Sequence, residues 1–380
     1  MPSRKPIYRR TFITSTSLGV LALCKGSHGA DPLHRVGIRR CRRYRYEEIH
    51  EQLSQLFEQI GGIPDLVRGK TVSIKVNLTN VRPNPVYTLP AIETVYTHPL
   101  VVLASCTLFH AYGANRIIIC ESMTRNDETK AIYNACGYNT AVFESMVPIL
   151  EWENTKNKGT GGKYHTLPVG ENAYAFTSFD FNHRYVETDV MVSIAKMKNH
   201  DICGLTLSLK NMFGAPPNAI YAEPGKESTT SAKGALHSGD KNTQMPGVIL
   251  PVLHPGEDGY RLPRIITDIC RARPIDLALI DGITTMSGGE GEWNGKQLGL
   301  AIPNVLIAGR NPVCTDAVAA AVMGFDPQGA GWKKPFPNAE NTLKMAADRG
   351  LGQNDLSQIE VLGLEIAQAR YTFMHGKKRD

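Results

Sequence analysis

Several common functional motifs are missing from the 380-residue sequence. None of its eight cysteines forms a C-x-x-C pair, so an iron–sulfur or zinc site of the usual local spacing is not supported. The glycine-rich loop at 287–295 matches neither the G-x-G-x-x-G turn nor the P-loop. Beyond the N-terminal region, no apolar run approaches the ~18 residues that a membrane span needs. We therefore expect no transmembrane span in the mature chain.

The composition is that of an ordinary folded protein. Hydrophobic residues make up 42% of the chain, enough for the core of one large or two modest domains. The net charge of +6 is mild, and much of the excess lies in the first ten residues and in the run 35–45. Because this run lacks aromatic platforms beyond Tyr44 and Tyr46, we expect a solvated strand face and no nucleic-acid partner.

The N-terminus has the order of parts found in twin-arginine export signals. Arg9 and Arg10 precede a short apolar stretch at 17–24, and a small-residue cleavage point follows near Ala30. We expect residues 1–30 to be a signal peptide recognised by the twin-arginine export machinery. The remaining 31–380 would form a single exported domain, periplasmic or otherwise extracytoplasmic. Proteins on this route often carry a cofactor, whose identity here is unknown.

Apolar runs and helical periodicities alternate along the mature chain. The predicted strands are 36–44, 71–78, 116–120, 190–195, 275–280 and 304–308. The predicted helices are 47–60, 98–112, 129–136, 264–271 and 312–323, and the segments 343–348 and 359–362 close the fold. This alternation predicts an α/β fold with a largely parallel or mixed sheet, flanking helices and long loop insertions. Segments 146–184 and 218–260 lack a clear period and are predicted to be mostly loops.

The segment 196–214, K-M-K-N-H-D-I-C-G-L-T-L-S-L-K-N-M-F-G, concentrates polar chemistry after the buried strand 190–195. Ligands in open α/β sheets gather just beyond such strand ends. Leu205, Leu209 and Met212 have the spacing of one helical face, which puts Thr206 and Lys210 on the other. The alternation of apolar and polar residues along 205–210 would also fit a β-strand. Both interpretations put Lys210 on the polar side.

Other candidate residues stand near the predicted strand ends. Lys75 and Asn77 are two apart at the end of a strand and so point to one side. Asp281 ends another strand, and Glu290 lies among four glycines, which let a backbone approach a ligand closely. Asp316 is the single charge inside an apolar helix, where it should meet a lysine, an arginine or a ligand.

Five sequence blocks resemble the domain-of-unknown-function 362 family over nearly all of the mature chain. They are I-K-V-N at 74–77, K-x-K-x-H at 196–200, G-L-T-L-S-L-K-N-M-F-G at 204–214, I-D-L-A-L-I-D-G at 275–282 and I-A-G-R-N-P-V-C-T-D at 307–316. The resemblance implies a fold and a site location, and it favours His237 over His254 as a site residue. Some members carry ferredoxin-type cysteine runs, which this chain lacks.

A second likeness concerns one spacing. His200 and Lys210 are ten residues apart, which is similar to a histidine and the cofactor-bearing lysine of the nickel-pincer lactate racemase family. That likeness implies that Lys210 anchors a cofactor and that His200 moves a proton. Independently of it, a neutral lysine in a desolvated pocket is a nucleophile, and a neighbouring histidine can act as its base.

Three hypotheses follow for these residues. The first is an enzyme acting on an anionic small molecule, with catalytic Lys198, His200 and Lys210. The residues expected to bind its substrate or cofactor are Lys75, Asn77, Asn211, His237, Asp281, Glu290 and Asp316. The second is a non-catalytic anion-binding or accessory protein of an extracytoplasmic redox system. The third is purely structural, with the lysines paired to Asp281 and Asp316. Lys196 is expected to face away from the site.

Overall fold

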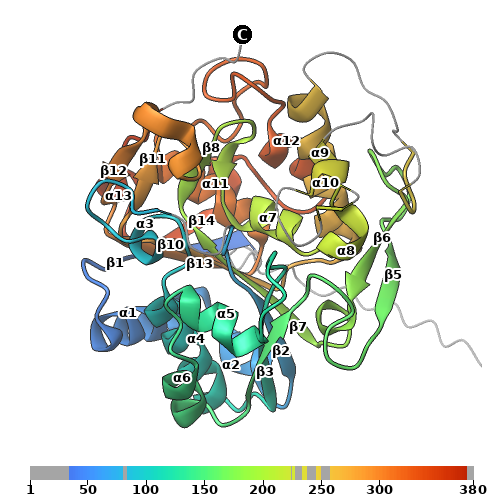
Figure 1. The fold of residues 1–380 in the computed structure, drawn as a ribbon. Coiled ribbons are helices and arrows are strands. Elements are labelled where there is room, and N and C mark those ends of the chain that lie inside the picture. Colours follow the sequence, from blue (N-terminus) through green and yellow to red (C-terminus); the bar gives the residue numbers. More distant parts are fainter. Residues whose placement is uncertain are drawn as a thin grey trace, which may run out of the picture.

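An eight-stranded sheet in the order β14-β1-β13-β10-β7-β2-β3-β4 organises the molecule (Figure 1). Its strands are β1 (Arg35–Arg40), β2 (Thr71–Lys75), β3 (Arg116–Glu121), β4 (Leu150–Asn154), β7 (Val190–Lys196), β10 (Leu277–Gly282), β13 (Val305–Gly309) and β14 (Glu360–Gly363). Neighbouring strands are parallel except at β13, which runs antiparallel to both β1 and β10. This mainly parallel sheet confirms the predicted α/β class.

The computed structural model describes residues 34–79, 84–223, 225–226, 233–237, 245–249 and 257–374. The predicted export signal, its cleavage point and His254 lie outside these residues. Within the described ranges, no helix combines the length and the apolar character that crossing a membrane requires. The seven cysteines in those ranges are all free and buried.

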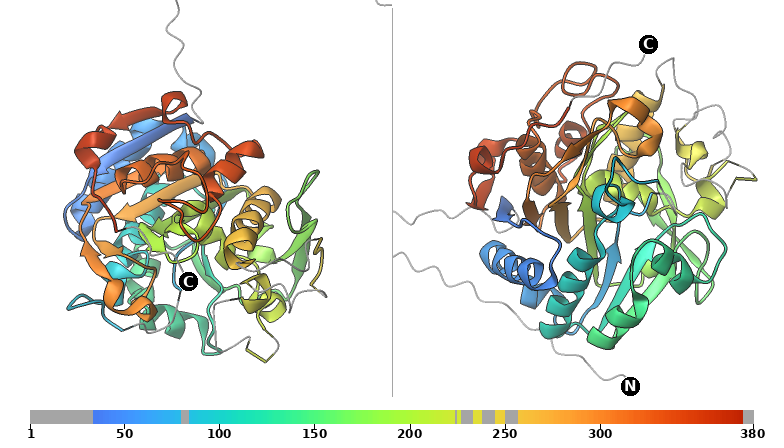
Figure 2. Two further views of the ribbon diagram at one scale, coloured as in Figure 1. Left: turned by 90° about the horizontal axis from the view of Figure 1, so that it is seen from above. Right: turned by 60° about the vertical axis from the view of Figure 1, so that its left-hand side comes forward.

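Helices cover both faces of the sheet (Figures 1 and 2). One layer contains α1 (Tyr46–Ile60), α2 (Ile63–Val67), α4 (Pro99–Ala111), α5 (Thr129–Ala135) and α6 (Thr140–Met146). The other contains α7 (Ser208–Asn211), α10 (Glu257–Ala272), α11 (Pro312–Val322) and α12 (Thr342–Asp348). In β3, Ile117 and Ile119 face the first layer while Ile118 and Cys120 face the second. Burial on both faces explains why such strands are continuous apolar runs.

Shorter elements lie outside these layers. The two-stranded sheets are β5 (Tyr164–Pro168) with β6 (Ser178–Asn182), β8 (Lys198–His200) with β9 (Gly204–Thr206), and β11 (Thr285–Ser287) with β12 (Gly299–Ala301). The short helices are α3 (Ala91–Thr94), α8 (Asn218–Tyr221), α9 (Gly234–His237) and α13 (Ile366–Ala369). The strands β4, β5 and β6 lie in the segment 146–184, where mostly loop was predicted.

The helix predicted from Leu205 onward begins later than expected. Residues 198–206 fold back as a hairpin in which Lys198 pairs with Thr206, and Gly204 adopts a φ of 77° next to the turn. A left-handed φ suits glycine because it has no Cβ. The helix α7 therefore begins only at Ser208. By contrast, α11 begins at Pro312 as predicted, and Asn311 caps it, with its side chain accepting from the backbone N–H of Val313 and Cys314.

Candidate functional site

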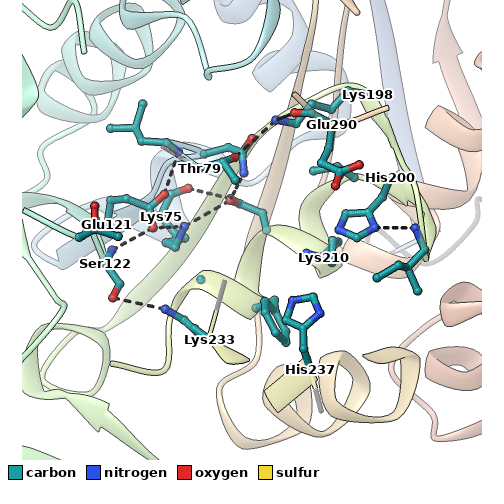
Figure 3. Close-up of a pocket in the computed structure, with 18 of the residues that line it drawn as sticks. Lys75, Thr79, Glu121, Ser122, Lys198, His200, Lys210, Lys233, His237 and Glu290 are labelled. Carbon is teal, nitrogen blue, oxygen red and sulfur yellow. Dashed lines mark hydrogen bonds and ion pairs between the residues drawn. The ribbon is translucent and has the colours of Figure 1, made fainter. Parts of the chain in front are cut away.

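The carboxyl ends of β7, β2 and β3, three neighbours in the sheet, meet at a pocket of about 460 Å³ (Figure 3). The hairpin β8–β9, helix α7 and helix α9 supply further walls. The lining includes Lys75, Asn77, Thr79, Glu121, Ser122, Thr124, Lys198, His200, Thr206, Lys210, Asn211, Phe213, Lys233, His237, Glu290 and Trp293. The pocket thus lies where ligands of open α/β folds usually bind.

Lys75 and Glu121 form a buried ion pair in this wall. The Lys75 Nζ lies 2.7 Å from Glu121 Oε1 and donates to the Val76 carbonyl at 2.7 Å. Glu121 also accepts from the backbone N–H of Leu78 and Ser122, each at 2.9 Å. Burial lowers the pKa of Lys75, and the charge of Glu121 opposes that shift. Each charge is therefore neutralised by protein groups.

Gly214 brings its backbone against this pair. A Cβ at Gly214 would lie 2.7 Å from Lys75 Nζ and 3.1 Å from Glu121 Oε1. Real Cβ atoms do not approach other atoms at 2.7 Å, so a side chain here would displace the ammonium. The glycine therefore allows the backbone to pack closely against the Lys75–Glu121 pair without moving the ammonium.

Lys198 is held by uncharged oxygens. Its Nζ donates to the carbonyls of Val95 at 2.8 Å and Glu290 at 3.0 Å, with Thr79 Oγ1 at 3.5 Å. Burial lowers the pKa of the Lys198 ammonium to about 7. Its charge therefore contributes to the potential of the pocket without being cancelled by a hydrogen-bonded carboxylate.

Lys210 and Lys233 add two more cations. Lys210 Nζ lies 4.6 Å from the centre of the Phe213 ring. The Phe213 and His237 rings pack edge to face, with their centres 5.2 Å apart. Burial lowers the pKa of Lys210, and the charge of Lys75 adds to the shift. Lys233 donates to Asn218 Oδ1 at 2.8 Å, and burial lowers its pKa to about 7.

The hydrogen bonds of His200 determine its tautomer. Its Nδ1 accepts from the backbone N–H of Ile202 at 3.1 Å and of Cys203 at 3.2 Å. In the neutral ring the proton must then be on Nε2, because Nδ1 is the acceptor. A neutral His200 is thus a hydrogen-bond donor at Nε2. The proton transfer by His200 that the sequence suggested stays a prediction.

Glu290 closes the pocket on the side of the glycine-rich loop. Its carboxylate accepts from the Asp201 backbone N–H at 2.9 Å and from the Trp293 indole at 3.1 Å. The Asn294 side chain accepts in turn from the backbone N–H of Glu290 at 2.9 Å. These bonds fix Glu290 in the wall and bring Trp293 to the pocket.

Comparison with known proteins identifies the family. The family model described as "Domain of unknown function (DUF362)" matches residues 72–321, which contain every lining residue of the pocket. The chain belongs to this family. A thylakoid-associated protein of Synechocystis sp. is 23% identical over 296 residues, covering 77% of this chain and 75% of the relative.

Two solved structures resemble this DUF362 chain at 14% identity. A Thermotoga maritima protein has a TM-score of 0.34 and covers 64% of this chain and 51% of its own. The lactate racemase apoprotein from Thermoanaerobacterium thermosaccharolyticum has a TM-score of 0.38 and covers 74% of this chain and 56% of its own. The DUF362 chain thus spans only a little over half the length of each.

Most of the predicted site residues of this DUF362 chain line the pocket. They are Lys75, Asn77, Lys198, His200, Lys210, Asn211, His237 and Glu290. Asp281 does not, because it is the register partner of Lys196 on the adjacent strand and pairs with it at 3.0 Å. Asp281 also accepts from Tyr44 Oη at 2.9 Å. Lys196 turns away from the pocket, as expected, toward this carboxylate.

Asp316, expected to meet a cation or a ligand, forms no ion pair with a lysine or arginine among the described residues and is held by backbone donors. Its carboxylate accepts from the backbone N–H of Ser208 at 2.9 Å and of Leu209 at 2.8 Å. Burial raises the pKa of Asp316 to about 7, and these hydrogen bonds oppose the shift. Backbone donors at the start of α7 therefore satisfy it, and it positions the helix that carries Lys210.

Two charged residues of the DUF362 pocket, Glu121 and Lys233, were not predicted from the sequence. Glu121 ends an apolar strand just as Lys75 does, so the same argument could have found it. Lys233 lies in a polar loop with no period, and nothing in its neighbourhood distinguished it from solvated lysines. Within the described ranges, no group of three or more His, Cys, Asp or Glu side chains could hold a metal ion.

Proposed function

We propose that the pocket binds an anionic small molecule and is the active site of an enzyme that uses Lys210 as its reactive amine. One observation carries the proposal: four lysines from separate segments line the pocket with only two carboxylates among its described lining residues. Glu121 is neutralised by Lys75, and Glu290 accepts from two N–H groups. The excess of lysines over carboxylates in the pocket therefore favours an anionic ligand.

The lysines have different roles in this proposal. Lys75 fixes Glu121 and the strand ends, and Lys198 supplies positive potential from a position held by carbonyls. Lys210 has an apolar neighbour, Phe213, and a lowered pKa, which are the conditions that make an amine nucleophilic. His200 donates from Nε2 to oxygen on the bound molecule.

Trapping with borohydride tests the amine. Pyruvate is an anion with a carbonyl: the amine would attack the carbonyl carbon, water would leave, and hydride would reduce the resulting imine to a stable amine. We expect intact-mass measurement to show one such adduct on the wild type and none on Lys210→Met. Lys344→Met, which removes an exposed lysine on α12, is the control and should keep the adduct.

The same measurement separates the two function classes. Anion binding with no adduct from a panel of anionic aldehydes and ketones would contradict Lys210 chemistry and favour the non-catalytic binding or accessory protein. If the protein binds no anion, both the enzyme hypothesis and the binding-protein hypothesis are contradicted.

We also propose that the protein is exported by the twin-arginine route. The N-terminal order of paired arginines, apolar stretch and small-residue site supports it. Replacing both Arg9 and Arg10 by lysine should retain the protein in the cytoplasm on cell fractionation. Unchanged distribution would contradict the proposal.

A further inference from the structure

The amide of Asn211 has a fixed orientation at the base of the pocket. Its Nδ2 donates to the Lys75 carbonyl at 3.1 Å and to Ser193 Oγ at 3.0 Å. Its Oδ1 therefore faces the other way and lies 3.4 Å from Lys75 Nζ. Exchanging the two atoms would set Oδ1 against the Lys75 carbonyl and Nδ2 against the Lys75 ammonium. The network thus makes Asn211 Oδ1 an acceptor.

This acceptor orients Asn77 in turn. Asn77 Nδ2 donates to Asn211 Oδ1 at 3.4 Å, and the opposite orientation would bring two carbonyl oxygens together. The backbone of Asn77 is also held, since its N–H donates to Thr97 Oγ1 at 3.0 Å and its carbonyl accepts from the Thr97 N–H at 3.1 Å. Asn77 Oδ1 consequently points away from the network.

Asn77 Oδ1 has no hydrogen-bond partner among the described residues, although it is buried in a side chain that is only 9% exposed and lines the pocket. A buried acceptor without a donor is costly, and the great majority of such groups are satisfied. Because Asn77 lines the pocket, a molecule bound there can supply the donor.

The charges around the pocket decide what kind of donor fits. Next to Asn77 the Lys75–Glu121 pair is neutral overall, while the ammonium groups of Lys198 and Lys233 contribute positive potential to the same pocket. An ammonium on the ligand would be repelled by these two lysines. A hydroxyl or amide N–H can donate without that cost.

We propose that the pocket's ligand is an anion that also carries a neutral hydrogen-bond donor, a hydroxyl or amide N–H, directed at Asn77 Oδ1. This inference rests on the proposed anion site and narrows its substrate class. The lysines hold the anionic group, and Asn77 distinguishes molecules that have the donor from those that lack it.

Calorimetric titration of matched anions tests the inference. The pairs are glycolate with acetate, 3-hydroxypropionate with propionate, and glycerol 3-phosphate with propyl phosphate. We expect the hydroxylated member of at least one pair to bind about tenfold more tightly, since an unpaired buried acceptor costs roughly that factor or more. In Asn77→Leu this preference should disappear while the non-hydroxylated member still binds.

Equal affinities within every wild-type pair would overturn the inference while leaving the anion site intact. A preference that survives in Asn77→Leu would overturn the role of Asn77. If no anion binds the wild type, the proposed function itself fails and the inference falls with it. The wild-type comparison needs no variant, and Asn77→Ala replaces Asn77→Leu if the latter does not fold.

Discussion

Lys196 and Lys198 are two residues apart at the end of β7, yet they lie in opposite environments. Lys196 and Asp281 are completely buried and pair at 3.0 Å, with Tyr44 Oη accepting from Lys196 at 2.7 Å. Lys198 lines an open pocket and donates to neutral carbonyls. A buried cation with its own carboxylate stabilises the fold, whereas a cation held by neutral oxygens can still attract an anion.

The region around Lys196 is a closed polar cluster. The Tyr44 ring stacks on the His98 ring at 3.6 Å, and Asp281 also accepts from the His98 backbone N–H at 3.0 Å. Lys196 and Asp281 join β7 to β10, and their hydrogen bonds to Tyr44 and His98 link these strands to the segments around residues 44 and 98. The cluster therefore connects the sheet to the residues that precede α1 and α4.

The largest effect should come from breaking this cluster. We expect Lys196→Met to lower the free energy of unfolding by about 3–5 kcal/mol, because it leaves the Asp281 carboxylate buried without its cation. Lys198→Met removes a cation that has no such carboxylate and should cost much less. Denaturant unfolding of both variants measures the difference.

A double variant sharpens that result. Lys196→Met with Asp281→Leu removes both charges and should recover much of the lost stability. Equal losses for Lys196→Met and Lys198→Met would contradict the distinction between the two environments.

A smaller effect is expected on binding when the pocket loses Lys210. Lys210→Met should weaken the binding of sulfate or a carboxylate by about tenfold to a hundredfold, the range for one hydrogen bond to a charged group. Trp293, which lines the pocket, offers a fluorescence signal for the titration. Lys344→Met is again the control, and an unchanged affinity in Lys210→Met would exclude direct contact with the anion.

The smallest expected effect is the pH dependence of binding. The pKa values of Lys198 and Lys233 are about 7, and a bound anion would raise them by favouring the charged forms. Sulfate affinity should therefore fall as pH rises above 7, by at most about tenfold per unit for each lysine that must be protonated. Calorimetry in buffers of different ionisation enthalpy should detect proton uptake on binding near pH 7.

Through the same two lysines, a rise in pH should increase stability although it weakens anion binding. Their pKa values are near 10.5 when unperturbed and about 7 in the folded protein, so the unfolded chain holds more protons between these values. The contribution of these lysines to unfolding free energy should thus rise with pH from 7 to 10.5. Lys198→Met and Lys233→Met should each reduce that rise, and a rise unaltered in both would contradict the lowered pKa values.

Much of the sheet was predictable because its strands are buried on both faces and leave continuous apolar runs. Polar residues that end such runs, such as Lys75 and Asp281, were recognisable for the same reason. Which carboxylate meets which lysine depends on the strand order. Because β10 lies beside β7 and β3 beside β2, Asp281 pairs with Lys196 and Glu121 with Lys75.

The structure of the short segment around Lys210 was harder to predict, for a different reason. The residues 204–212 fit both the helical and the alternating spacing, and a hairpin followed by a single helical turn uses each in part. The buried Asp316 decides where the turn begins by accepting from the backbone of Ser208 and Leu209. These two hydrogen bonds join Asp316 to residues that are 108 and 107 positions away in the chain. No local sequence pattern reveals such a contact.

The contact of Gly214 with the Lys75–Glu121 pair links three positions that are far apart in the chain. A side chain at position 214 would either displace the Lys75 ammonium from Glu121 or require a shorter residue at position 75. Across the family, these positions should therefore change together or remain fixed together. Relatives with any residue other than glycine at the position of Gly214 should also lack the long cation, and in them the pocket would have evolved to a different charge.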